Sequence, residues 1–263
     1  MVTMLVFFKS ENKATIPRSN GYLLLSAFSR ILPSVFHSDT NLAPSISPLL
    51  PREFFNGVVT FHGLPQELRP PIGEIFVSRV GFLNDRDAEE FRFALQGQEI
   101  CLNGAKFTVA EILEETKFCS YRSWDEIYQV TGASHELKFS FLTPTAFKRQ
   151  DKLYLLPDPS VLFTSLLLKL QRIDGTIEEG ETANLESNFE NILISRCRIS
   201  TDVMFLKGKM QNKGFVGEVT YDLSYCEGHV AKNATFLAEF ARYSGVGIKT
   251  SQGMGSVWTE TKM

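Results

Sequence analysis

The hydrophobic and polar positions in the first half of the chain change period several times. Residues 2–8 are β-branched and aromatic and stop at a polar run, which predicts a strand. Apolar residues then recur at helical spacing at Leu24, Phe28 and Ile31, which predicts a helix with one buried face. The same reasoning predicts strands at residues 54–61, 74–82 and 106–113, and a second helix at residues 88–95 with capping residues at 84–87.

The second half of the chain repeats the order strand, helix, strand, strand, helix, strand. In chain order it predicts a strand at 137–142, a helix after the capping residues 157–160, a strand at 191–205, a turn at 208–214, a strand at 215–223, a helix at 230–243 and a strand at 256–259. This repetition predicts an α+β protein made of two tandem ferredoxin-like βαββαβ domains. We place them at residues 1–120 and 135–263, joined by a linker near residues 120–134.

Composition and charge limit the classes of function that are open to the protein. The 263 residues carry a formal charge of -3, so the net field does not attract polyanions, and any nucleic-acid binding must come from local basic patches. The four cysteines form no close pair of the type that ligates zinc. The chain shows no secretory start and no apolar run of about 20 residues. We therefore expect a cytoplasmic protein with reduced cysteines, no zinc site of that type and no membrane segment.

A glycine-rich segment follows the last predicted helix. Gly245, Gly247, Gly253 and Gly255 fall within eleven residues, and between them lie the polar residues Lys249, Thr250, Ser251 and Gln252. Exposed backbone amides and little side-chain bulk suit the binding of a phosphate group. The spacing fits neither a P-loop nor a dinucleotide-binding fingerprint. The alternative for Gly245 alone is that it caps the preceding helix.

This segment resembles the glycine-rich C-terminal loop of the RAMP superfamily of CRISPR-associated proteins. Within that superfamily the chain most resembles the sixth Cas family, the endoribonucleases that cut the repeats of CRISPR precursor transcripts. Further stretches of the resemblance occur in family order at residues 35–37 and 46–49, 142–147 and 156–159, and 214–219.

The resemblance implies metal-independent cleavage of CRISPR repeat RNA. It places the catalytic histidine at His37, whose imidazole can exchange protons near neutral pH. Tyr22, fifteen positions earlier, matches a second catalytic position of some members, and an aromatic residue at the edge of the core is its alternative interpretation. Some members carry a lysine six residues after the histidine, where this chain has Ala43. Arg52, Lys249 or Arg30 are candidates for the missing cation.

For RNA binding we expect the whole glycine-rich loop, together with basic residues elsewhere. Lys207, Lys209 and Lys213 lie near the predicted turn of the second domain. A second basic group follows the 142–147 stretch, and its members are Lys148, Arg149 and Lys152. Such clusters contact the phosphates of RNA, although a solvated turn is the usual explanation of a lysine cluster.

Two other functions are left open by the sequence. One is a non-catalytic RNA-binding subunit of a CRISPR effector complex, and the other is an enzyme that binds a small phosphorylated ligand on a ferredoxin-like scaffold. A homodimer is also left open. The main hypothesis makes a geometric prediction: His37 and the glycine-rich loop, far apart in sequence, lie near one RNA-binding face.

Overall fold

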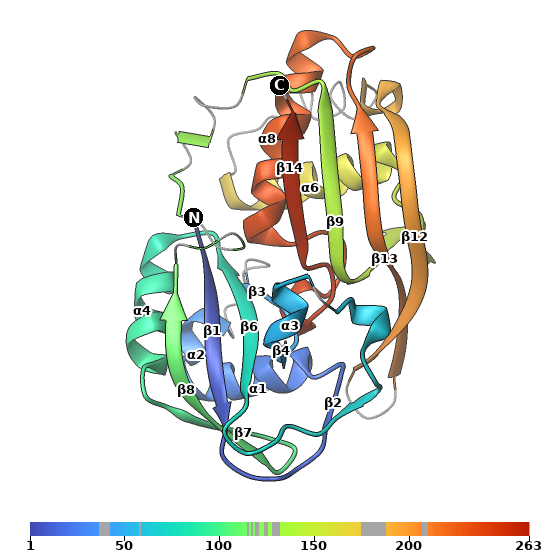
Figure 1. Ribbon diagram of the computed structural model, residues 1–263. Coiled ribbons are helices and arrows are strands. Elements are labelled where there is room, and N and C mark those ends of the chain that lie inside the picture. The colour runs from blue at the N-terminus through green and yellow to red at the C-terminus, as the bar shows by residue number, and fades with distance from the viewer. Residues whose placement is uncertain are drawn as a thin grey trace.

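The computed structural model describes residues 1–36, 43–57, 59–114, 116, 118, 121–123, 126–127, 132–174, 188–206 and 210–262. Within these residues the chain forms two units, each an antiparallel sheet with helices packed on one face (Figure 1). None of the described helices is both long and apolar enough to cross a membrane.

The first unit contains a sheet in which β1 is central. Its elements are β1 (Val2–Ser10), β2 (Ile16–Pro17), α1 (Gly21–Ile31), α2 (Pro33–Phe36), β3 (Ser45–Ile46), β4 (Leu50–Pro51), α3 (Arg52–Phe55), η1 (Phe61–Gly63), β5 (Glu67–Leu68), β6 (Ile75–Phe82), α4 (Asp85–Leu95), β7 (Glu99–Leu102) and β8 (Ala105–Leu113). The strand order is β3-β6-β1-β8-β7, and β4 also pairs with β6. With β3 and β4 sharing the edge position beside β6, this is the predicted ferredoxin-like order with one added strand.

The strand predicted at residues 54–61 is wrong. Arg52–Phe55 forms the short helix α3, and the chain then turns at Gly57, which has a φ of +74°. Phe54 and Phe55 are both buried, whereas neighbouring residues of a strand point to opposite faces. The edge position beside β6 is instead occupied by β3 and β4. Strand β7 was not predicted, although Asn103 and Gly104, both with positive φ, are a typical hairpin turn between β7 and β8.

The second unit has the same topology. Its elements are β9 (Glu136–Thr145), β10 (Phe147–Arg149), β11 (Lys152–Tyr154), α6 (Pro159–Asp174), η2 (Phe189–Asn191), β12 (Leu193–Leu206), β13 (Met210–Asp222), α8 (Gly228–Ser244), η4 (Thr250–Gln252) and β14 (Val257–Lys262). The sheet order β12-β13-β9-β14 confirms the second ferredoxin-like unit. The predicted turn at 208–214 is too long, because β13 already begins at Met210. The hairpin of β10 and β11 was not predicted.

The two units share apolar contacts as well as their own cores. Helices α1 and α4 pack with the first sheet in one buried cluster, and α6 and α8 pack with the second sheet in another. The far end of the β12–β13 hairpin reaches the first unit (Figure 1), where Met204, Leu206 and Val216 join the first cluster. The residue boundaries of two separate domains remain a prediction, and seven of the fifteen residues of the predicted linker at 120–134 lie outside the described residues.

The C-terminal end of α8 joins the two units. The last carbonyl groups of a helix have no partner within the helix and need donors from elsewhere. Arg79 of β6 donates to the carbonyl of Arg242, and the Ser45 hydroxyl of β3 donates to that of Tyr243 at 2.7 Å. Arg79 is almost fully buried and its Nε also donates to the Phe118 carbonyl. The first unit therefore caps a helix of the second.

The glycines of the loop allow backbone segments to touch. A Cβ atom built on Gly21, at the start of α1, would lie 2.5 Å from the Cα of Gly253. A Cβ built on Gly255 would lie 2.0 Å from the carbonyl oxygen of Val246, and Gly255 also has a φ of +67°. No side chain fits at these separations. The loop is thus packed tightly between the last helix, the last strand and α1.

A buried ion pair forms a second connection. Nη2 of Arg18 donates to Oδ1 of Asp202 on β12 at 2.8 Å, and both side chains are buried. Nη1 of Arg18 also donates to the carbonyls of Phe61 and Leu64. Nδ1 of His62 lies 3.5 Å from the other carboxylate oxygen of Asp202. Such a pair is costly to break, because removing one charge leaves the other buried without a counter-charge.

We therefore expect Asp202→Asn to lower the free energy of unfolding by about 3 kcal/mol, since it leaves the Arg18 guanidinium buried and uncompensated. Chemical denaturation measures this loss. Asp151→Asn is the matched control, because Asp151 is 96% exposed at a hairpin turn. Equal stability of the two variants would contradict a structural role for the Arg18–Asp202 pair.

Gly255→Ala is expected to lower the free energy of unfolding by at least about 2 kcal/mol, from a strained φ and a backbone overlap. Gly228→Ala is its control, because a Cβ at the start of α8 meets nothing within 4 Å. Alanine favours the helix there, so the control is expected to be neutral or slightly stabilising. A neutral Gly255→Ala variant, measured by thermal unfolding, would show that the loop adjusts freely.

Candidate nucleic-acid interface

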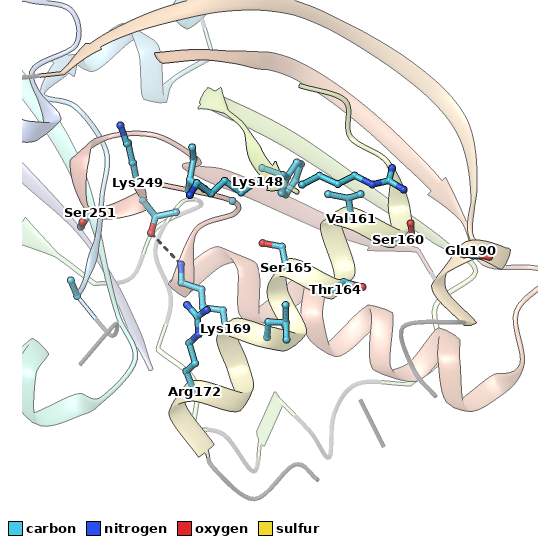
Figure 2. Close-up of a pocket in the computed structure, with 17 residues that line it drawn as sticks. Lys148, Ser160, Val161, Thr164, Ser165, Lys169, Arg172, Glu190, Lys249 and Ser251 are labelled. Atoms are coloured by element: carbon cyan, nitrogen blue, oxygen red, sulfur yellow. Dashed lines mark hydrogen bonds between the residues drawn. The ribbon is translucent and has the colours of Figure 1, made fainter. Parts of the chain in front are cut away.

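A basic groove of about 920 Å³ lies between α6, the β10–β11 hairpin and the glycine-rich loop (Figure 2). Ala43, from the first unit, also lines it. Five cationic side chains and one carboxylate face this space, and they are Lys148, Arg149, Lys169, Arg172, Lys249 and Glu190. The groove is therefore locally positive, although the protein as a whole carries a net negative charge. Local positive charge of this kind favours the binding of a polyanion.

Helix α6 forms the floor of the groove. The Asp158 carboxylate accepts a hydrogen bond from the Val161 amide at 3.2 Å and caps the helix, as the sequence predicted. One face of α6 buries its leucines in the second core. The face toward the groove carries hydroxyl groups in its first half and cations in its second, in the order Ser160, Thr164, Ser165, Lys169 and Arg172.

The β10–β11 hairpin provides the opposite wall. Lys148 and Arg149 are both exposed and both line the groove. Lys148 lies 3.3 Å from Asp151, and the Arg149 guanidinium lies 5.7 Å from the centre of the Tyr154 ring. These are weak surface contacts, so both cations remain able to bind phosphate groups.

Lys249 occupies the turn of the glycine-rich loop. Its backbone is left-handed, with a φ of +57°, and its Nζ donates to the Asn212 side chain on β13 at 2.7 Å. Burial lowers the pKa of Lys249 below its ordinary value. The lysine therefore links the loop to the β12–β13 hairpin, and it also lines the groove.

The ammonium group of Lys169 is held between the end of α8 and the glycine-rich loop. Its Nζ donates to the Ser244 carbonyl, the last of α8, and to the Thr250 hydroxyl at 3.1 Å. Burial, and to a lesser degree the charge of Arg172, lowers the pKa of Lys169 to about 7. Near neutral pH this side chain is accordingly only partly charged.

Several loop amides are already used within the protein. Val246 donates to the Gly255 carbonyl, Ile248 to the Ala146 carbonyl, and Gly255 to the Pro144 carbonyl. Gly247, Lys249, Thr250 and Ser251 line the groove, and the backbone hydrogen bonds that connect this loop to other described segments include none from their amides. These amides are the candidates for binding an anion.

The structure brings together some of the predicted binding residues. Gly247, Lys249, Thr250 and Ser251 line the groove, whereas Gln252 is half-buried in η4 behind it. Gly245, Gly253 and Gly255 are buried in the same loop. Gly245 does end α8, with a φ of +65° and a ψ of 173°, and its amide donates to the Ala241 carbonyl. The identity of these three glycines is explained by close packing.

Other predicted residues lie away from the groove lining. Arg52 is exposed on α3, with its guanidinium 6.0 Å from the centre of the Phe7 ring. Arg30 is exposed on α1 and contacts Ser26. Lys213 is exposed on β13, in a strand and not in the predicted turn, on the opposite side from its neighbour Asn212. Tyr22 is half-buried against the first core, next to Gly21.

Three predicted residues, His37, Lys207 and Lys209, lie outside the described residues. The described residues nearest to His37 in sequence are Phe36 and Ala43. Phe36 is buried among Phe28, Phe82 and Phe91, and Ala43 lines the basic groove. The proximity of His37 itself to the loop remains a prediction.

The sequence analysis missed Lys169 and Arg172. Ser165, Lys169 and Arg172 are spaced four and three residues apart, which places them on one face of a helix. The signal available in the sequence was the apolar run 161–170, which Thr164, Ser165 and Lys169 interrupt with polar side chains. No group of three or more possible metal ligands occurs among the described residues.

Known proteins resemble this chain in sequence. Residues 139–257 match the family model of the CRISPR-associated endoribonuclease Cas6. A Mycobacterium tuberculosis protein of that description is 28% identical over 179 residues, which cover 68% of this chain and 53% of the relative. A Streptococcus thermophilus protein of the same description is 28% identical over 182 residues, covering 68% and 72%. The chain thus spans about half the length of the first relative.

Solved structures resemble it in fold. Thermus thermophilus Cas6 superposes with a TM-score of 0.74 at 23% identity, over 98% of both chains. A structure described as a Cas6 product complex gives a TM-score of 0.79 at 22% identity, over 99% of both chains. The tandem ferredoxin-like fold is confirmed by this likeness. The family model over residues 139–257 and the two sequence relatives support the predicted resemblance: in sequence the chain is similar to the Cas6 family of CRISPR-associated endoribonucleases.

Proposed function

We propose that this protein binds CRISPR repeat RNA in the basic groove and cuts precursor transcripts into guide RNAs. The observation that carries the proposal is the meeting, in one groove, of the glycine-rich loop, five cations and Ala43. Ala43 lies six residues after His37 in sequence, and we place the predicted catalytic residue next to this groove as part of the proposal. A relative of the same fold is described as a product complex, which supports RNA as the ligand.

Binding rests on phosphate contacts. Lys148 of the hairpin lies across the groove from Lys169 and Arg172 of the helix, and Lys249 lies at one end (Figure 2). Arg149 of the hairpin also lines the groove. Contacts of this kind hold and orient a nucleic-acid backbone and carry little sequence information. Loop amides of Gly247 and Ser251 supply further donors to phosphate oxygens.

Cleavage needs no group beyond the RNA and a proton carrier. The ribose 2′-hydroxyl loses its proton as its oxygen attacks the adjacent phosphorus, the bond from phosphorus to the 5′-oxygen breaks, and the leaving oxygen takes a proton. His37 exchanges one of these two protons as general base or general acid. The cations of the groove offset the negative charge that develops on the phosphate. The products carry a 2′,3′-cyclic phosphate, or a 3′-phosphate after hydrolysis, and a 5′-hydroxyl.

The test is cleavage of an RNA that carries the repeat of the source genome's own CRISPR array, in the presence of a chelator. We expect cutting by the unmodified protein, and a loss of at least about 100-fold for His37→Ala, the size of a general acid or base contribution. Product ends are identified by mass spectrometry.

Other outcomes would contradict the role of His37, the cleavage chemistry or the proposed function. Unchanged cutting by His37→Ala would remove that residue from the mechanism, and products with a 3′-hydroxyl would require different chemistry. Repeat binding without any cutting would favour the non-catalytic RNA-binding subunit. Displacement of the RNA by mononucleotides would favour an enzyme that binds a small phosphorylated ligand.

Phosphate contacts also predict the salt dependence of RNA binding. Lys148→Met is expected to weaken binding and to reduce the slope of log affinity against log salt by about 0.7 to 1, the value for one lost phosphate contact. Lys106→Met is the control, because Lys106 is an exposed lysine of β8 that does not line the groove. Equal slopes for the two variants, measured by fluorescence anisotropy, would contradict binding in this groove.

A further inference from the structure

The ammonium group of Lys169 has more donors than the protein uses. A protonated lysine carries three N–H groups. Two of them have acceptors, the Ser244 carbonyl and the Thr250 hydroxyl. Among the described residues the structure gives no third acceptor for this nitrogen, and the side chain lines the groove. One donor is thus available to a ligand bound there.

The surroundings of Lys169 disfavour its charge in the free protein. Arg172 lies on the same helix, Lys249 comes from the glycine-rich loop, and Lys148 and Arg149 come from the hairpin. Glu190 lines the opposite end of the groove in Figure 2, beyond Ser160. No described carboxylate lies within ion-pair distance of Lys169. Burial, and to a lesser degree the charge of Arg172, lowers the pKa of Lys169 to about 7.

A phosphate group bound in the groove shifts the protonation equilibrium of Lys169. It brings negative charge close to the ammonium group and supplies the missing third acceptor, and both effects favour the protonated form. The protonated side chain also holds the loop more firmly, because charged donors make stronger hydrogen bonds to Ser244 and Thr250.

Resting on the proposed function, we propose that Lys169 is a positioning residue that takes up a proton when RNA enters the groove and thereby fixes the glycine-rich loop against α6. The proton comes from solvent and no covalent bond changes. RNA affinity then depends on pH through this one side chain, which lies at the junction of α6, α8 and the loop.

The experiment measures RNA affinity between pH 6 and pH 9 at constant ionic strength. All proteins carry His37→Ala, which prevents turnover in the proposed mechanism and removes the imidazole as a second titrating group. The probe is the same repeat RNA as in the cleavage assay. For a group that titrates near pH 7 in the free protein, the dissociation constant is expected to rise about fivefold from pH 7 to pH 8.

Two substitutions test whether Lys169 causes this dependence. Lys169→Arg keeps a permanent charge and is expected to flatten the pH profile, and Lys169→Met is expected to flatten it and also to weaken binding. Lys148→Met is the matched control from the opposite wall, expected to weaken binding while retaining the fivefold change. A fivefold change that persists in both Lys169 variants would overturn the proposal.

A direct measurement keeps the proposal testable if a variant fails to fold. The titration of Lys169, followed by NMR of the protein with isotope-labelled lysine side chains, is expected near pH 7 in the free protein and at higher pH with RNA bound. The same midpoint in both states would overturn the proposal while leaving RNA binding intact. Absence of RNA binding at every pH would instead overturn the proposed function and this inference together.

Discussion

The carbonyl groups at the C-terminal end of α8 are the constraint on which the arrangement of the two units depends. Four of them in succession are satisfied by donors from four places: the Gly245 amide, Arg79, the Ser45 hydroxyl and Lys169. A helix end buried without such partners would be strongly unfavourable. The negative end of the helix dipole also favours the two cations among these donors. One helix terminus thus sets the relative positions of both sheets and of α6.

The shape of the groove depends on the packing at this helix end. The glycine-rich loop leaves α8 at the junction and returns to the sheet as β14, so its path is fixed at both ends. Contacts of Gly253 with Gly21 and of Gly247 with the Ala146 carbonyl hold it in between. The cations of the groove are therefore kept close together in spite of their mutual repulsion. Such preorganised charge favours an anionic ligand, because the cost of gathering the cations has been met in folding.

The periodicity of hydrophobic residues correctly predicted the helices and strands that bury one regular face. The two long helices of the second unit, the central strands and the capping role of Asp158 were predicted from single stretches of sequence, and so was the tandem topology. The prediction was wrong where burial is irregular: Phe54 and Phe55, adjacent and both buried, suggested a strand and form a helix. Aromatic content alone does not distinguish these two outcomes.

The candidate site was harder to predict than the fold because it joins residues that no local pattern relates. The loop was recognised by its glycines, yet most of them serve backbone contacts across the junction and not the ligand directly. Lys169 was missed because a lysine in an amphipathic helix usually faces solvent. Its position under Ser244 and Thr250 depends on the packing of α6 against α8, which single-sequence reasoning does not supply.

The helix junction also bears on the order of folding. Arg79 and Ser45 belong to the first third of the chain, whereas their acceptors in α8 lie more than 160 residues later. During synthesis the first sheet can form long before these acceptors emerge, and until then its buried guanidinium has no helix end to bind. Contacts of such long sequence separation form late and slow the approach to the native state. Arg79 and Ser45 can therefore make these hydrogen bonds only after the last helix has been synthesised and has packed against the first unit.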